Sequence, residues 1–176
     1  MNAREFVNDY INTKIPEGEL VKLGLSDSFV NNLNKCYIVP EKRIYVNTGN
    51  ELSNLIYNFD VSNIEIGLIR FNNVLKDNDN FIFIGKIEID DIILNKETFE
   101  IEVYEFGTKH FLWSCAKNAS TFLESLIICN TFFNSRIIDD GLWENMQETS
   151  KVIKDCTNIV GGTKYSDFYK MLLGYY

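Results

Sequence analysis

The chain has 176 residues, of which 45% are hydrophobic and 14% aromatic, a composition that predicts one globular domain over residues 1–176 and excludes a disordered chain. Seventeen basic against twenty-five acidic residues leave a net charge of −8, which disfavours nucleic acid or anionic lipid as a partner and favours a basic protein. The alternative is that the charge serves only solubility.

The cysteines and the N-terminal segment predict a cytoplasmic protein with no metal and no cofactor. Residues 1–6 lack an apolar signal core, and no apolar run approaches the roughly 20 residues of a membrane span. The four cysteines form no Cys-x-x-Cys pair and lack the spacing of metal ligands. They are Cys36, Cys115, Cys129 and Cys156. We therefore expect four free thiols in a reducing compartment.

The first third of the chain predicts few regular elements. Apolar spacing indicates a helix over residues 2–13, which Pro16 ends. Loops and short turns are expected over 16–35, followed by short strands at 36–39 and 43–46. Thr48 and Glu51 then have the Thr-x-x-Glu form of a capping box at the start of another helix.

The middle of the chain predicts an antiparallel meander over residues 81–115. A β-branched strand at 64–71 and a polar loop at 72–80 precede it. Within the meander we expect a bulge or bend at Gly85, a hairpin turn at 95–98 and a last strand over 110–115. Ile87 and Ile89 are expected to alternate with Glu88 and Asp90 along one strand, and Phe99, Ile101 and Val103 with Glu100, Glu102 and Tyr104 along another.

The remainder predicts helices. Asn118 is a good N-cap for a long helix, a second helix is expected at about 141–157, and Gly161 and Gly162 break the chain before a last helix that reaches Tyr176. Helix, strands and then helices make an α+β fold. The region from about 141 to 176 is expected to be a helical extension of the domain.

No catalytic constellation stands out. His110 and Cys115 are five residues apart in one strand, so their side chains point to opposite faces. Residues 161–164 lack the upstream glycine of a phosphate-binding loop. Four acids, Asp90, Asp91, Glu100 and Glu102, could serve acid–base chemistry, but acids that alternate with apolar residues more often mark a solvated or a binding face.

The charge of the 86–106 hairpin favours a binding face. Seven acids and two lysines between Lys86 and Phe106 give a local charge of −5. If the apolar residues point into the core, alternation brings the acids together on the other face, where their repulsion has a cost that a binding role would explain. The predicted partner-binding residues are Glu88, Asp90, Asp91, Glu100, Glu102, Tyr104 and Glu105.

The stretch from 81 to 133 resembles the SUKH superfamily. The resemblance is carried by Phe83-Ile84-Gly85, by Asp90-Asp91, by the turn at 95–98 before a strand ending in Val103-Tyr104, and by the helix opening at 118–126, with looser matches at Ile15-Pro16 and Leu23-Gly24-Leu25. The sequence departs from the family pattern at Phe99, where a turn glycine is common, and at Asn118, where a serine cap is usual.

The resemblance implies an α+β fold with a curved antiparallel sheet backed by helices. Bacterial members of the superfamily are immunity proteins that neutralise polymorphic or contact-dependent toxins, often nucleases or deaminases, and fungal members are regulatory scaffolds in cell-wall signalling. The resemblance thus implies a non-catalytic, protein-binding immunity protein. The alternatives are a regulatory scaffold and, less favoured, a small carboxylate-dependent enzyme.

Overall fold

The computed structural model describes residues 1–175 of the chain. Its elements, in chain order, are α1 (Ala3–Asn12), α2 (Glu17–Lys22), α3 (Asp27–Cys36), α4 (Glu51–Asn58), β1 (Glu65–Ile66), β2 (Ile69–Asp77), β3 (Phe81–Ile87), β4 (Asp90–Asn95), β5 (Ile101–Tyr104), β6 (Phe111–Ala116), α5 (Ala119–Ile138), the one-turn helix η1 (Asp140–Trp143), α6 (Met146–Val160), the one-turn helix η2 (Thr163–Tyr165) and α7 (Ser166–Leu173).

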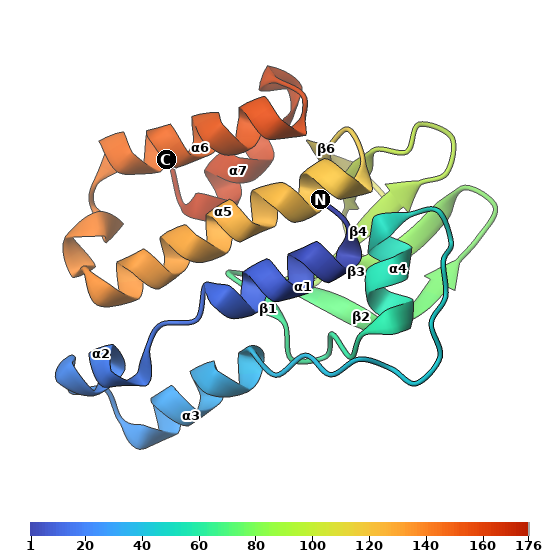
Figure 1. Cartoon of the computed structure of the whole chain (residues 1–176). Coiled ribbons are helices and arrows are strands. Elements are labelled where there is room, and N and C mark those ends of the chain that lie inside the picture. The colour runs from blue at the N-terminus through green and yellow to red at the C-terminus, as the bar shows by residue number, and fades with distance from the viewer. Residues whose placement is uncertain (176) are drawn as a thin grey trace.

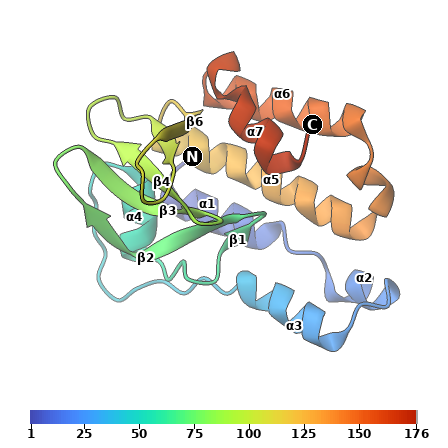
Figure 2. The same ribbon diagram turned by 180° about the vertical axis from the view of Figure 1, so that it is seen from behind.

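The six strands form one curled antiparallel sheet in the order β1-β2-β3-β4-β5-β6. Figure 1 shows α1, α4 and α5 in front of the strands, and Figure 2, the view from behind, shows the strands in front of these helices. α6 packs on α5, and α7 contacts both α6 and β6. The expected α+β class, with a curved antiparallel meander backed by helices, is confirmed.

The main core lies between the sheet and the helices. Fully buried aromatic side chains from α1, α5 and α7 meet apolar side chains from every strand there. The largest contributions come from Phe6, Tyr10, Phe122, Phe168 and Tyr169 on the helices and from Ile69, Ile84, Ile92, Ile101 and Val103 on the strands. The sheet and these helices therefore share one continuous apolar core.

Gly85 permits the bend of the sheet at β3. The pairing of β3 with β4 shifts register between Phe83 and Gly85. A Cβ atom on Gly85 would lie 2.3 Å from the carbonyl oxygen of Arg70 on β2, so only glycine fits this close approach of two strands. The bulge expected at Gly85 is confirmed.

Asparagine side chains cap the N-termini of four helices, α1, α4, α5 and α6. The Asn118 side chain accepts a hydrogen bond from the Thr121 amide at 3.0 Å, as expected. The capping box predicted for Thr48 and Glu51 is wrong. Asn50 is the N-cap of α4 and accepts from two amides at 3.1 Å, while the Glu51 carboxylate accepts from the Ala3 amide at 2.8 Å and thereby ties α4 to α1. Asn at position 50 satisfies the helix amides directly, so Thr48 is not needed as a cap.

The expectations for residues 16–46 are wrong. Residues 16–35 contain α2 and α3 rather than loops, Cys36 ends α3 instead of opening a strand, and only an isolated bridge from Glu41 to Phe59 lies near the second expected strand. The two helices bury few side chains, mainly Leu20 and Val30 in a small cluster separate from the main core. The apolar residues of α3 nevertheless follow helical spacing, with Val30 and Leu33 packed in that cluster, so this helix was missed in the sequence.

The region 64–80 differs from expectation in where the chain turns. Residues 64–71 form the short strand β1, a turn at Gly67 with φ of +57°, and the start of β2. β2 then continues to Asp77 through the segment expected to be a polar loop. β1 pairs only with Ile69 and Arg70, so the rest of β2 is a sheet edge with solvated side chains, which accounts for its polar sequence.

The alternation expected through Ile89 is wrong. Glu88 and Ile89 form the two-residue turn between β3 and β4, where Ile87 pairs with Asp90. Ile89 is 68% exposed, and Glu88 has a φ of +52°. Such turns require positive φ and usually contain glycine or asparagine, so this one carries no sequence signal. Phe99 likewise lies outside the strands and is exposed.

The C-terminal helices follow the expectation with one shift. α6 begins at Met146, because residues 140–143 form η1 instead. Gly161 and Gly162, with φ of +121° and +113°, end it as predicted. The aromatic stripe of α7 is buried, whereas Tyr176, assigned to the same stripe, lies outside the described residues.

Candidate protein-binding face of the sheet

The sheet has one face turned away from α1, α4 and α5, which we call the open face. On β4, Ile92 and Leu94 belong to the main core, so Asp91 and Ile93 point to the opposite side. Tyr104 on β5 pairs with Asp91 across the strands and shares this side. The alternation of β4 and β5 thus assigns carboxylate, aliphatic and aromatic side chains to the open face.

Aromatic rings from three strands meet on the open face. The ring of Tyr104 lies 5.5 Å from that of Phe81 on β3 and 5.8 Å from that of Phe111 on β6, measured between centroids. Edge and tilted contacts at these distances are favourable for aromatic pairs. Ile93 on the same face is only 1% exposed. The rings therefore form a second, smaller apolar layer on the face that the helices leave uncovered.

A cavity of about 570 Å³ opens on this layer. Phe81, Phe83 and Ile93 line it from β3 and β4, and Tyr104 and Phe106 line it from β5 and the following loop. Polar lining comes from Asn78, Asn80, Asp91, Glu105 and Lys109. Its volume and its mixture of apolar walls with a few polar groups are typical of binding sites.

A cation already lies at the edge of this cavity. The Lys86 ammonium is 3.5 Å from the carboxylate of Asp91 and 4.4 Å from the centroid of the Phe106 ring. Phe106 is 59% exposed, so its ring is accessible as well as electron-rich. Carboxylate and ring together attract positive charge, and Lys86 shows that an amine fits between them.

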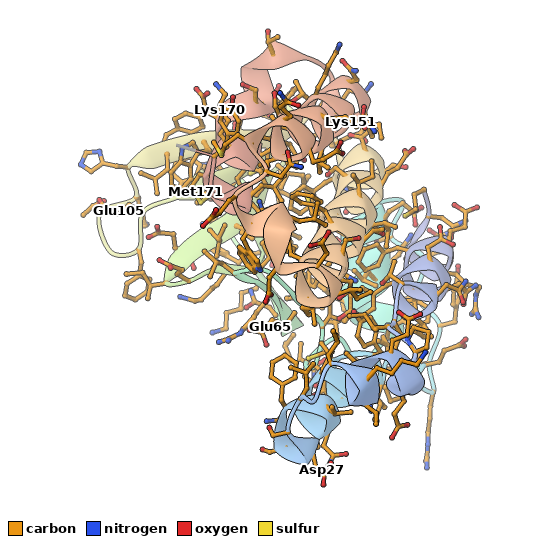
Figure 3. All side chains as sticks on the ribbon, turned by 90° about the vertical axis from the view of Figure 1, so that its left-hand side faces the viewer. Asp27, Glu65, Glu105, Lys151, Lys170 and Met171 are labelled. Carbon is orange, nitrogen blue, oxygen red and sulfur yellow. The ribbon has the colours of Figure 1, made fainter. Side chains whose placement is uncertain are left out.

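Three of the predicted partner-binding residues, Asp91, Tyr104 and Glu105, line the cavity. Glu105 lies on the outlying loop between β5 and β6, as Figure 3 shows, and its carboxylate accepts a hydrogen bond from Thr108. Glu88 is exposed in the β3–β4 turn. Figure 3 also labels Asp27 on α3, which lies far from Glu105, at the other end of the molecule.

Glu102 is buried rather than presented to solvent. It is 8% exposed and accepts hydrogen bonds from the Tyr104 hydroxyl at 3.3 Å and from the Asn95 side chain at 3.4 Å. Burial and the neighbouring Glu102 carboxylate raise the pKa of Tyr104. Glu102 therefore lies beside Tyr104 on the same face of β5 and is hydrogen-bonded to it, which corrects the expectation that it is a free, solvent-exposed acid.

Asp90 and Glu100 also do not join the expected row of free acids. Asp90 accepts a hydrogen bond from the Phe106 amide at 3.0 Å and so fixes the loop that carries Phe106. Glu100 accepts from the Lys164 ammonium at 2.6 Å and from the Tyr165 hydroxyl at 2.9 Å. Because the turn at 88–89 interrupts the alternation, these acids tie loops to the fold instead of crowding one face.

The aromatic residues of the site were not predicted from the sequence, because the predicted binding face was based on the acidic residues. Phe81 and Phe83 stand two apart in β3, a spacing that places both on one face. Their run of four apolar residues indicated a strand but gave no role to the two rings. Phe106 and Phe111 flank the last turn and carried no assigned role, although exposed aromatic residues so close in sequence are a usable signal of an interface.

The cysteines carry no sign of reactivity. All four are free, and Cys115 is buried, which raises its pKa well above the usual value. His110 is exposed at the start of β6. Within residues 1–175, no three His, Cys, Asp or Glu side chains gather in a way that could hold a metal ion, and none of the helices has the length and apolarity to cross a membrane.

Comparison of the chain with family models, with curated proteins and with solved structures gave no significant match. The resemblance to the SUKH superfamily therefore stays a prediction that rests on the residues quoted for it.

Proposed function

We propose that this protein is a non-catalytic immunity protein that binds and neutralises a bacterial toxin domain, a nuclease or deaminase with a basic surface, through the open face of its sheet. The observation that carries the proposal is the cavity on that face, with aromatic walls and with Asp91 and Glu105 in its lining. The sheet is backed on one side only, so this surface is available to a partner.

The chemistry of the open face suits a basic protein. Aromatic residues dominate the energetic centres of protein interfaces, and the rims of interfaces are polar. Phe106 and Phe111 are both more than half exposed. A nuclease presents lysine and arginine side chains to its nucleic-acid substrate, and these fit the site where Lys86 already lies between Asp91 and Phe106.

The arrangement of the acids argues against the rival carboxylate enzyme. Glu100 is bound to Lys164 and Tyr165, and Asp90 to the loop amide of Phe106. Glu102 is hydrogen-bonded to Tyr104. Of the four candidate acids, Asp91 alone is in the described lining of the cavity. Paired acid–base catalysis needs two carboxyl groups near one substrate atom.

The test is to purify the toxin domain encoded directly beside this protein's gene and to measure its enzymatic activity with and without the protein. We expect inhibition at a 1:1 ratio, together with rescue of growth when the two are produced in one cell. A regulatory scaffold would bind without abolishing the activity. A protein that cleaves or modifies the toxin, leaving an altered mass, would contradict the non-catalytic role.

A further inference from the structure

A second cavity, of about 400 Å³, lies where the end of α5, η1, the end of α7 and the β1–β2 turn come together. Its walls are mostly apolar and include Leu68, Phe133, Trp143, Met171 and Leu172. Met171 is labelled on α7 in Figure 3. A neighbouring cavity of about 230 Å³ shares Phe133 and Trp143 with it, so the apolar surface continues beyond the first cavity.

One charged side chain, Arg136 of α5, stands in the described lining of the larger cavity. It is only 3% exposed. The rings of Phe132 and Trp143 lie 4.4 Å and 4.8 Å from its guanidinium carbon. Aromatic rings at these distances stabilise the cation across its faces, which leaves the N–H groups at the edges of the guanidinium to find acceptors.

The acceptors found in the fold are too few for this cation. One terminal nitrogen donates to the Leu173 carbonyl at 3.0 Å, at the end of α7, and the other to the Thr149 hydroxyl at 2.9 Å. The Nε–H group is buried with no acceptor among the described residues. A guanidinium has five N–H donors, so most of its hydrogen-bonding capacity is unused.

The same cation has no full counter-charge in the part of the chain that the structure describes. No carboxylate of residues 1–175 forms an ion pair with Arg136. The carbonyl end of α7 supplies only a partial negative charge. Burial without a counter-ion lowers the pKa of Arg136, as expected for a charge that is removed from water.

We propose that this cavity binds a small amphipathic carboxylate, whose head pairs with the guanidinium of Arg136 and whose apolar body lies against Phe133, Met171 and Leu68. Carboxylate and guanidinium match in geometry and form paired hydrogen bonds. An apolar body of roughly ten carbons suits a cavity within the roughly 300–1,000 Å³ range of small-molecule sites. This site is separate from the open face and does not depend on toxin binding.

The test compares decanoate with decanol, which has the same chain but no charge, using Trp143 as the fluorescent reporter in a Trp113→Phe background. We expect decanoate to bind saturably and at least tenfold more tightly than decanol. In a folded Arg136→Gln variant the difference should disappear. Decanoate that binds no more tightly than decanol, or a folded Arg136→Gln variant that keeps the preference, overturns the proposal.

A second variant tests the proposal even if Arg136→Gln does not fold. Leu68 lines the cavity and is 44% exposed, so Leu68→Glu adds a repelling carboxylate without disturbing the core. We expect at least fivefold weaker binding of decanoate. Leu23→Glu is the matched control, because Leu23 is 42% exposed and lies outside the cavity. Equal decanoate affinities for the two variants overturn the proposal whatever Arg136→Gln does.

Discussion

At the residue scale, Phe99 is held in a backbone conformation that favours glycine. Phe99 follows the 95–98 turn with a φ of +62° and is 61% exposed. The left-handed region is unfavourable for side chains with a Cβ atom and open to glycine.

Phe99→Gly should therefore stabilise the protein. We expect its free energy of unfolding to rise by about 1 kcal/mol, because relief of the left-handed strain outweighs the extra entropy of glycine in the unfolded chain. Phe99→Ala is the control, since it removes the ring but keeps the Cβ atom. Urea unfolding of the three proteins measures the effect, and a glycine variant no more stable than the alanine variant would refute it.

Tyr165 makes stability depend on pH in the alkaline range. Burial first, and then its hydrogen bond to Glu100, raise the pKa of Tyr165 from 10.0 to about 12. The stabilisation is complete below pH 10 and declines as pH rises toward 12, because only the unfolded chain loses the proton in that interval. Tyr165→Phe should lose less stability than the wild type between pH 9 and 11 in matched thermal melts. Parallel losses in the two proteins would count against this assignment.

At the element scale, α5 is the helix that joins the parts of the fold. It contacts α1, α4 and α6 as well as strands β1 and β6. Its N-cap, Asn118, was predictable because a polar cap precedes a long apolar pattern. α2 and α3 were missed although local signals were present. Ser26 caps α3 by accepting from the Phe29 amide, and Gly24, with a φ of +67°, follows the end of α2.

Loss of the Asn118 cap should weaken the whole fold through α5. Asn118→Ala leaves the Thr121 amide without its acceptor, and we expect a loss of about 1 kcal/mol in the free energy of unfolding. Asn118→Ser should stay near the wild type, because serine is also a good N-cap. Chemical denaturation distinguishes the variants, and equal losses in both would mean that the cap itself is not what matters.

The turns explain why part of the site escaped prediction. The period-two pattern correctly located β5 as a strand, and the hairpin turn expected at 95–98 lies between β4 and β5. The Glu88-Ile89 turn has neither glycine nor asparagine, so the alternation was carried across it in error. The three acids that proved structural, Asp90, Glu100 and Glu102, are joined to groups that only the folded chain brings near, and no local pattern reveals such contacts.

At the scale of the whole molecule, the two faces of the sheet differ in their surroundings. One face builds the core against the helices, and the open face carries the cavity with Phe106 and Glu105 at its edge. Charge reversal at Asp90, Glu100 and Glu102 would test folding more than binding, because all three are bound within the fold. Side chains that make few internal contacts are the better probes of an interface.

Glu105→Lys should slow association with a basic toxin domain. The residue is exposed on the β5–β6 loop, and rim charges act mainly on the association rate and its salt dependence. We expect the rate constant to fall several-fold at low salt and the difference from the wild type to shrink as salt is raised. Stopped-flow mixing at several salt concentrations measures this, and a salt-independent difference would point to a packing defect instead.

The most direct measurement is the dissociation constant of the complex with the neighbouring toxin domain for two matched aromatic truncations. Phe106 on the open face is 59% exposed, and Tyr57 on α4 is 45% exposed. Calorimetric titration should show that Phe106→Ala weakens binding roughly 30-fold or more, as for a hot-spot residue, while Tyr57→Ala leaves it within about twofold. An unchanged affinity for Phe106→Ala beside a large loss for Tyr57→Ala would contradict the account, because the partner would then bind the helical side of the molecule.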